Sequence, residues 1–247
     1  CLVASLPFYF FGCMGFAPEF ASFTNALFES TSGLTTTGAT ILKSISTLPH
    51  GMHWWRSITQ WYGGMGIIVF SLVVLPQLGV GGMQLFKAEV PGPTADKATP
   101  RLQDTARLLW RAYVLISAAE VVALLLAGMN VFDAFCHTFT TMATGGFSTK
   151  DNGAMFFAGQ PGIIIVLTAF MFLAGTNFSL HMALLLKRQW RIHLRDAEFR
   201  VYAMITLGLT VLITARLLLK GIYVSVPEAF MHSLFNVVSI ITTTGYN

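Results

Sequence analysis

Charged residues are scarce in this sequence. Asp, Glu, Lys and Arg make up 11% of the 247 residues, against about 25% in soluble globular domains, whereas hydrophobic residues make up 54%. The mean hydropathy is +0.66. This composition excludes an ordinary soluble domain, and several apolar stretches reach the roughly 20 residues that cross a bilayer. We therefore expect an integral membrane protein.

Cysteines and the motifs of enzymes are also rare. The three cysteines lack the spacing of metal ligands and are odd in number, which favours small buried apolar residues over a disulfide framework or a zinc site; they are Cys1, Cys13 and Cys136. No phosphate-binding Gly-rich loop, no HExxH motif and no nucleophile paired with a base is visible. Nothing in the sequence favours nucleic-acid binding. We expect neither an enzyme nor a cofactor.

Hydropathy divides the chain into long and short apolar stretches. Five stretches predict membrane spans, at 1–18, 53–80, 104–128, 160–187 and 198–221. Three shorter ones suit helices that enter a membrane and return, at 20–34, 130–142 and 227–241. Most basic residues lie in 81–111 and 187–200, which the positive-inside rule places in the cytoplasm.

A threonine-glycine motif follows each short stretch. Its copies read TSGLTTTGAT (31–40), TTMATGGFST (140–149) and SIITTTGYN (239–247). We align them on Gly38, Gly145 and Gly245, which places Phe28, Phe135 and Phe235 ten positions earlier in each copy. Three copies at similar spacing predict three versions of one structural unit.

The motif has a physical reading at membrane depth. A helix that stops inside the membrane leaves backbone carbonyls that lipid cannot satisfy, so they must face protein or a water-filled path. A cation coordinates such carbonyls in place of its hydration shell, and glycine permits the positive φ that turns them toward one axis. A single copy would favour a kink or a helix-packing site, whereas three copies favour an ion path.

At this point the sequence resembles a known family. The motifs FESTSGLTTTGAT, HWWRSITQWYGGMGIIVFSLVVLP, TMATGGFST and SLFNVVSIITTTGYN are similar to those of the Trk/Ktr/HKT superfamily of K⁺ transporters, and most similar to its bacterial TrkH family. The resemblance implies an all-α polytopic membrane protein. Its repeated M1–pore helix–M2 units would carry re-entrant selectivity-filter loops around a K⁺ channel-like pseudo-fourfold pore.

The resemblance also implies a division of the chain, which we expect to be a fragment. The first repeat would cover 1–80 with a truncated M1, followed by a cytoplasmic linker at 81–103. The second repeat would cover 104–188, followed by a basic cytoplasmic loop at 189–197. The third, at 198–247, would contain M1, the pore helix and the filter only.

Site residues are carried over position by position. The residues implied to bind K⁺ through backbone carbonyls are Thr36, Thr37, Gly38, Ala143, Thr144, Gly145, Thr243, Thr244 and Gly245. Supporting positions are Glu29, Ala39, Gly146 and Tyr246, with Gly146 replacing the Ala39 or Tyr246 of the other copies. Because Glu29 lies within the short helix behind the filter, we expect it to brace the filter by a buried hydrogen bond.

The resemblance further implies K⁺ uptake by a multi-pass protein of the bacterial inner membrane. Its partners would be a second copy in a homodimer, membrane lipid and a cytosolic TrkA-type nucleotide-binding ring on the basic inner face. The alternatives are a secondary transporter with broken helices and a membrane anchoring subunit that does not conduct. Only the channel reading requires the three motifs to converge on one axis.

Two further groups of polar residues can be interpreted from the sequence. His53, Trp54, Trp55 and Arg56 resemble an interfacial aromatic belt with a snorkelling cation. Polar residues at 175–181 lie within an expected span, where we expect either helix–helix hydrogen bonding or the lining of the pore cavity.

Overall fold

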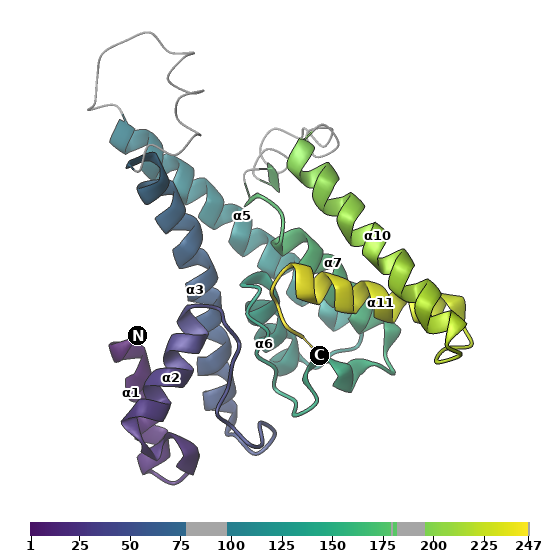
Figure 1. The fold of residues 1–247 in the computed structure, drawn as a ribbon. Helices are drawn as coiled ribbons and strands as arrows, with labels where there is room; N and C mark the ends of the chain where they lie inside the picture. Colours follow the sequence, from purple (N-terminus) through teal and green to yellow (C-terminus); the bar gives the residue numbers. More distant parts are fainter. Residues whose placement is uncertain (78–97, 179, 182–195, 247) are drawn as a thin grey trace.

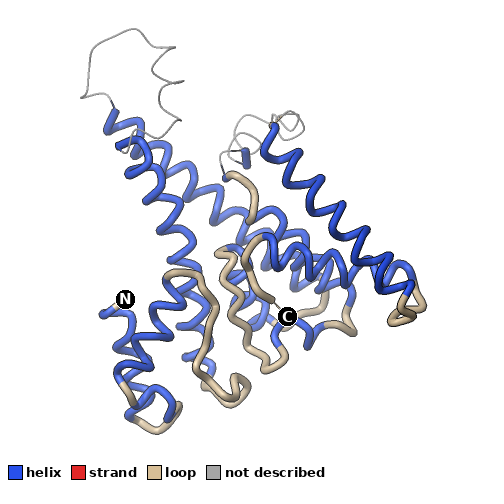
Figure 2. Tube along the Cα trace, viewed as in Figure 1, coloured by secondary structure: helices blue, strands red, loops and turns tan. Residues whose placement is uncertain are grey.

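The computed structural model describes residues 1–77, 98–178, 180–181 and 196–246. These residues form helices joined by loops, with no strand among them, as predicted (Figure 2). The helices of 20 residues or more are α3 (His50–Gln77), α5 (Ala98–Leu126) and α10 (Ala197–Leu219). The shorter ones are α1 (Leu2–Cys13), α2 (Phe23–Leu34), α6 (Val131–Met142), α7 (Pro161–Ala174) and α11 (Val226–Ile241), with 3₁₀ turns η1 (Pro18–Ala21) and η3 (Gly153–Phe157).

Local sequence signals set several helix starts. The Asn130 side chain accepts a hydrogen bond of 2.8 Å from the amide of Asp133 and caps α6. Asp196 caps α10 in the same way through the amide of Phe199. Pro161 begins α7, where a missing amide proton costs nothing. These caps explain why the short and long helices begin close to the predicted positions.

One expected span is shorter than predicted, and another is interrupted. The span expected at 1–18 is the 12-residue helix α1, and Gly15 with φ 81° turns the chain into η1. In the span expected at 160–187, α7 ends at Ala174, where the amide of Thr176 turns back to the carbonyl of Leu173, and residues 178, 180 and 181 are helical again. Residues 182–187 lie outside the described part, as do 81–97 and 189–195 of the predicted linkers.

Among the described residues, two helices are long and apolar enough to cross a membrane by length and composition, Thr105–Leu126 and Ala197–Leu219. In the second, only 17% of the apolar window is buried inside the protein. Met204 and Leu212 are among its exposed side chains, at 64% and 62%. Exposed apolar surface of this kind is suited to contact with lipid or with further helices.

One packing scheme occurs in each repeat. The first helix packs on the short helix (α1 on α2, α5 on α6, α10 on α11), and the short helix packs on the helix that follows it (α2 on α3, α6 on α7). The following helix also contacts the short helix of the next repeat (α3 on α6, α7 on α11), so the repeats lie side by side in chain order (Figure 1).

The cysteines only partly follow expectation. Cys136 is buried in α6, whereas Cys1 and Cys13 are exposed, so the prediction of burial was wrong for these two. Both lie at the ends of α1, where few elements cover them. The described residues include no cluster of His, Cys, Asp and Glu that would hold a metal ion.

Candidate functional site

Each short helix ends in the same unusual backbone conformation. The second residue after α2, α6 and α11 has positive φ although it is a threonine: Thr36 (54°), Thr144 (51°) and Thr243 (59°). These are the only positive-φ residues other than glycine in the described chain. A β-branched residue in this region is a rare outlier. Three such outliers at equivalent places indicate a conformation imposed for a purpose.

The glycine two residues later fixes the alignment of the copies. It has positive φ at Gly38 (77°), Gly146 (76°) and Gly245 (76°), whereas Gly145 is not in this conformation. The alignment on Gly145 was therefore wrong by one residue, and Gly145 takes the place of Thr37 and Thr244. The sequence could not decide this, because two adjacent glycines are equally free to adopt positive φ.

The corrected register also moves the neighbouring positions. Ala143 matches Thr35 and Thr242, the residues that end the other two helices. Phe147, not Gly146, matches Ala39 and Tyr246. Ten positions before the glycine, the residue that matches Phe28 and Phe235 is then Cys136 and not Phe135. We refer to residues 35–39, 143–147 and 242–246 as the filter segments, after the role predicted for them.

The three filter segments lie against one another in chain order. A Cβ placed on Gly38 would overlap the carbonyl oxygen of Gly145, and one on Gly146 would overlap the carbonyl oxygen of Thr244. A Cβ on Gly245 would meet nothing within 4 Å. The second segment is accordingly more buried than the first and the third. The segments thus lie next to one another in chain order, and the third is open on the side of Gly245.

Most carbonyls of these segments accept no hydrogen bond. Within the described part of the chain, none reaches the carbonyl oxygens of Thr36, Thr37, Gly38, Thr144, Gly146, Thr243, Thr244 and Gly245. Of these eight residues only Thr244 is buried, so most of the row is open to solvent or to a bound ion. A row of unpaired carbonyls on three convergent segments is therefore suited to coordinating a cation.

A side-chain brace behind the segments is shared by the first two repeats. Glu29, fully buried in α2, accepts a 2.8 Å hydrogen bond from the Thr40 hydroxyl and a 3.3 Å one from the Ile41 amide. At the equivalent positions in the second repeat, His137 Nε2 lies 3.1 Å from the Ser148 hydroxyl. This correspondence agrees with the corrected register, and the supporting role of Glu29 remains a prediction.

The third segment is held to the second repeat by Tyr246. Its hydroxyl lies within hydrogen-bond distance of the hydroxyls of Thr140 and Thr141 in α6. Its carbonyl accepts a 2.7 Å bond from Ser239, as the carbonyl of Ala39 accepts one from Ser32. The residue after the glycine thus anchors its segment to the helix behind it.

Arg56 is not an interfacial cation, as the sequence suggested, but a buried one. Its side chain is 1% exposed, and Nε donates a 2.9 Å hydrogen bond to Glu29. Nη1 donates to the carbonyl of Ser148 at 3.4 Å, and the guanidinium lies 4.1 Å from the centre of the Phe147 ring. His53 is buried as well. Arg56 therefore joins the first repeat to the second filter segment.

Sequence reasoning missed Arg56 and also Gln60, which lies one turn further along α3. The Gln60 amide is fully buried and contacts the second segment on both sides of Gly146. The available signal was the i, i+4 spacing of two polar residues in a membrane helix, which places them on one face. The sequence did not indicate that this face meets the next repeat.

The loops beyond the segments are joined by Asp151. Its carboxylate accepts hydrogen bonds from the amides of Ile45 and Ser46 and from the hydroxyls of Ser44 and Ser46. The Ser46 hydroxyl, followed by the two amides, lowers the pKa of Asp151 to about 2. The loop of the second repeat thus holds the loop of the first.

The hydrogen bonds between Asp151 and the loop of the first repeat are expected to persist in mild acid. Because the pKa of Asp151 in the folded protein lies below its ordinary value of about 3.9, its stabilisation is complete above pH 4 and is lost as the pH falls toward about 2. Spin labels on Lys43→Cys and Asn152→Cys, in a cysteine-free background, should keep a narrow distance distribution from pH 7 to 4. Asp151→Ala should broaden it at every pH, and broadening of the unsubstituted loops between pH 6 and 5 would contradict this account.

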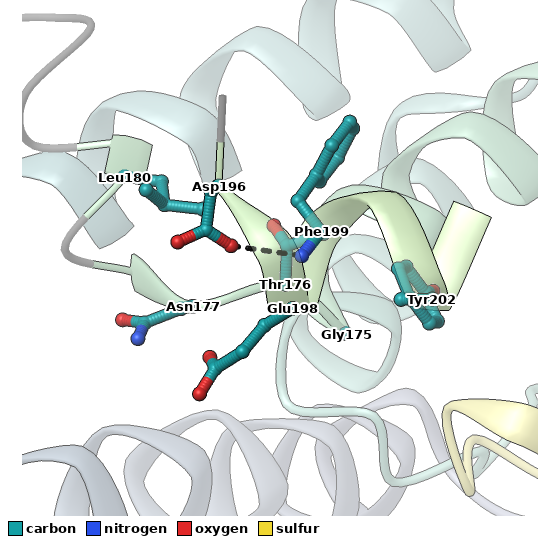
Figure 3. Close-up of a pocket in the computed structure, with 8 residues that line it drawn as sticks. All are labelled: Gly175, Thr176, Asn177, Leu180, Asp196, Glu198, Phe199 and Tyr202. Atoms are coloured by element: carbon teal, nitrogen blue, oxygen red, sulfur yellow. Dashed lines mark hydrogen bonds between the residues drawn. The ribbon is translucent and has the colours of Figure 1, made fainter. Parts of the chain in front are cut away.

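A hollow lies next to the start of the third filter segment, since a Cβ on Gly175 would lie 2.6 Å from the Thr242 side chain. A cavity of about 130 Å³ lies between the end of α7 and the start of α10, lined by Gly175, Thr176, Asn177, Leu180, Asp196, Glu198, Phe199 and Tyr202 (Figure 3). Asp196 is engaged in capping α10. The Thr176 hydroxyl bonds His181 at 2.6 Å and the Leu173 carbonyl at 2.7 Å. Thr176 thus bonds residues close to it in sequence, and both interpretations of the polar residues at 175–181, helix–helix hydrogen bonding and lining of the pore cavity, remain predictions. Ser179 lies outside the described part.

Comparison with known proteins points to one family. A family model described as TrkH, a cation transport protein, matches residues 14–247. The Trk system potassium uptake protein TrkH of Salmonella typhimurium is 45% identical over 245 residues, covering 99% of this chain and 50% of the relative. The Trk system potassium uptake protein TrkG of Escherichia coli K12 is 39% identical, covering 91% of this chain and 46% of the relative.

A solved structure agrees with these matches. The crystal structure of the potassium transporter TrkH from Vibrio parahaemolyticus superposes with a TM-score of 0.77 at 35% identity, over 96% of this chain and 50% of that one. The chain spans about half the length of the curated relatives it matches. It belongs to the TrkH family of cation transport proteins, which are integral membrane proteins and not enzymes.

Proposed function

We propose that the protein containing this chain takes up K⁺ through a pore whose filter segments coordinate the dehydrated ion by backbone carbonyls. The observation that carries the proposal is the row of unpaired carbonyls on three convergent segments. The names of the relatives, which are potassium uptake proteins of Trk systems, agree with it. Carbonyl oxygens replace the hydration shell of K⁺ without the tight binding of a carboxylate.

The corrected register defines the proposed filter. Its glycines are Gly38, Gly146 and Gly245, and the preceding positions are Thr36 and Thr37, Thr144 and Gly145, and Thr243 and Thr244. The open edge beside Gly245 is the place for a fourth segment supplied by the rest of the protein. The short helices α2, α6 and α11 would then be re-entrant pore helices, each directing its C-terminal end toward the ion.

The finer predictions from the sequence belong to the same proposal. The protein would lie in the bacterial inner membrane as a homodimer, with a cytosolic TrkA-type nucleotide-binding ring as its regulatory partner. The relatives' membership of Trk systems supports a multi-component assembly. Copurification of the intact protein with such a ring, and the mass of the complex, would test both partners.

Uptake of ⁸⁶Rb⁺ into liposomes tests the proposed activity directly. The intact protein is reconstituted with its nucleotide-binding partner, and K⁺ or Na⁺ is added as competitor. We expect competition by K⁺ and not by Na⁺, because backbone carbonyls of a filter replace the hydration shell of K⁺. Absence of flux in correctly inserted protein would favour the secondary-transporter or anchoring readings.

A further inference from the structure

Gln60 is the only described side chain that hydrogen-bonds a carbonyl inside the proposed ion-binding row. It lies in the middle of α3, is fully buried, and donates from Nε2 to the carbonyl of Gly145 at 2.8 Å. Its Oε1 accepts from the amide of Phe147 at 3.2 Å. One side chain thus holds the peptide groups on both sides of Gly146.

The chemistry of this contact is specific to an amide. A primary amide donates and accepts at once, so it matches a backbone that presents a carbonyl and an N–H two residues apart. Gly146 between them has φ 76°, a conformation that the flanking peptides must maintain. The Gln60 amide therefore bonds the backbone of the second segment in the way that a neighbouring strand would bond it in a sheet.

The fixed carbonyl faces the first segment. The Gly145 oxygen lies where a side chain on Gly38 would be, so its position sets how closely the first and second segments approach. The equivalent carbonyls of Thr37 and Thr244 accept no hydrogen bond from a described residue. The second segment is thus held from α3 in a way that the first and the third are not.

We infer that Gln60 is a positioning residue for ion selectivity, holding the Gly145 carbonyl and the first-to-second segment spacing at the value suited to K⁺. The inference rests on the proposed function. Without the amide, the Gly145 carbonyl and the Phe147 N–H lose their partners and the second segment relaxes. A more flexible ring of carbonyls contracts around the smaller Na⁺ more readily. The preference for K⁺ over Na⁺ therefore falls, while the pore still conducts.

The test uses the intact protein with Gln60→Leu, which removes both hydrogen bonds, and Gln60→Glu, which retains an acceptor for Phe147 but no donor for Gly145. Tyr62→Phe is the matched control, since Tyr62 is 53% exposed on the same helix. The readout is the ratio of Na⁺ to K⁺ concentrations that halve ⁸⁶Rb⁺ uptake. We expect both Gln60 variants to lower it about two- to tenfold, the scale of one hydrogen bond, and Tyr62→Phe to leave it unchanged.

A coupling experiment separates positioning from general damage. A methyl group at Gly145 would overlap the Gln60 amide, so Gly145→Ala should displace it and lower the ratio by itself. Combined with Gln60→Ala, it should lower the ratio no further than Gln60→Ala alone, because the amide is already gone.

The outcomes separate this inference from the proposed function. Unsubstituted protein without K⁺-competed flux would overturn the proposed function itself. Normal flux in that protein, with an unchanged ratio in both Gln60 variants, would overturn the role of Gln60 alone. Loss of folded protein in both variants, judged by thermal unfolding, would assign Gln60 to stability and overturn its role in selectivity.

Discussion

Gly146→Ala is expected to reduce the preference of the intact transporter for K⁺ over Na⁺ by tenfold or more. Gly146 has φ 76°, where an L side chain costs on the order of 1–2 kcal/mol. Its Cβ would overlap the carbonyl oxygen of Thr244, which is backbone and cannot rotate away. The third segment must therefore shift, and the carbonyl row loses its spacing. Competition of K⁺ and Na⁺ against ⁸⁶Rb⁺ uptake measures the change.

The matched control is Gly66→Ala. Gly66 lies in α3 with nothing within 4 Å of the added Cβ, so its substitution should leave uptake and selectivity unchanged. Gly38→Ala should resemble Gly146→Ala, because its Cβ would overlap the carbonyl of Gly145. Normal selectivity in Gly146→Ala, together with a large loss of selectivity in Gly145→Ala, would show instead that Gly145 is the residue equivalent to Gly38 and Gly245.

Arg56→Met is expected to destabilise the protein by about 3–5 kcal/mol, the cost of leaving one member of a buried ion pair without its partner. Arg56 and Glu29 are 1% and 0% exposed, and the Nε–Oε1 distance is 2.9 Å. The substitution also removes the donor to Ser148 and the contact with the Phe147 ring. Denaturant unfolding of the solubilised intact protein measures the loss.

The double variant Glu29→Leu/Arg56→Met is the control for this prediction. It removes both charges, and apolar pairs of similar volume often replace buried ion pairs with little loss of stability. We expect it to recover most of the stability lost in Arg56→Met. Arg56→Lys should recover less, because a lysine cannot bond Glu29 and Ser148 with the fork of a guanidinium. A loss of stability below about 1 kcal/mol in Arg56→Met would contradict this role of the Arg56–Glu29 ion pair.

Most of the helices and the place of the candidate site could be predicted from the sequence. The short apolar stretches gave α2, α6 and α11, and the expected spans at 53–80, 104–128 and 198–221 correspond to α3, α5 and α10 within a few residues. These features are local, since they depend on hydropathy, caps and spacing along the chain. The repeated Thr-Gly motif indicated the three segments because each copy follows its own helix.

The register of these segments and the side chains that hold them depend on contacts between repeats. Gly145 and Gly146 are equivalent as far as local conformational freedom is concerned, and contacts with Thr244 and Gln60 select Gly146 as the residue with positive φ. Arg56 appeared to be an interfacial cation because its partners, Glu29 and Ser148, are distant in sequence. Such roles arise when one repeat packs against the next, which no pattern within a single helix encodes.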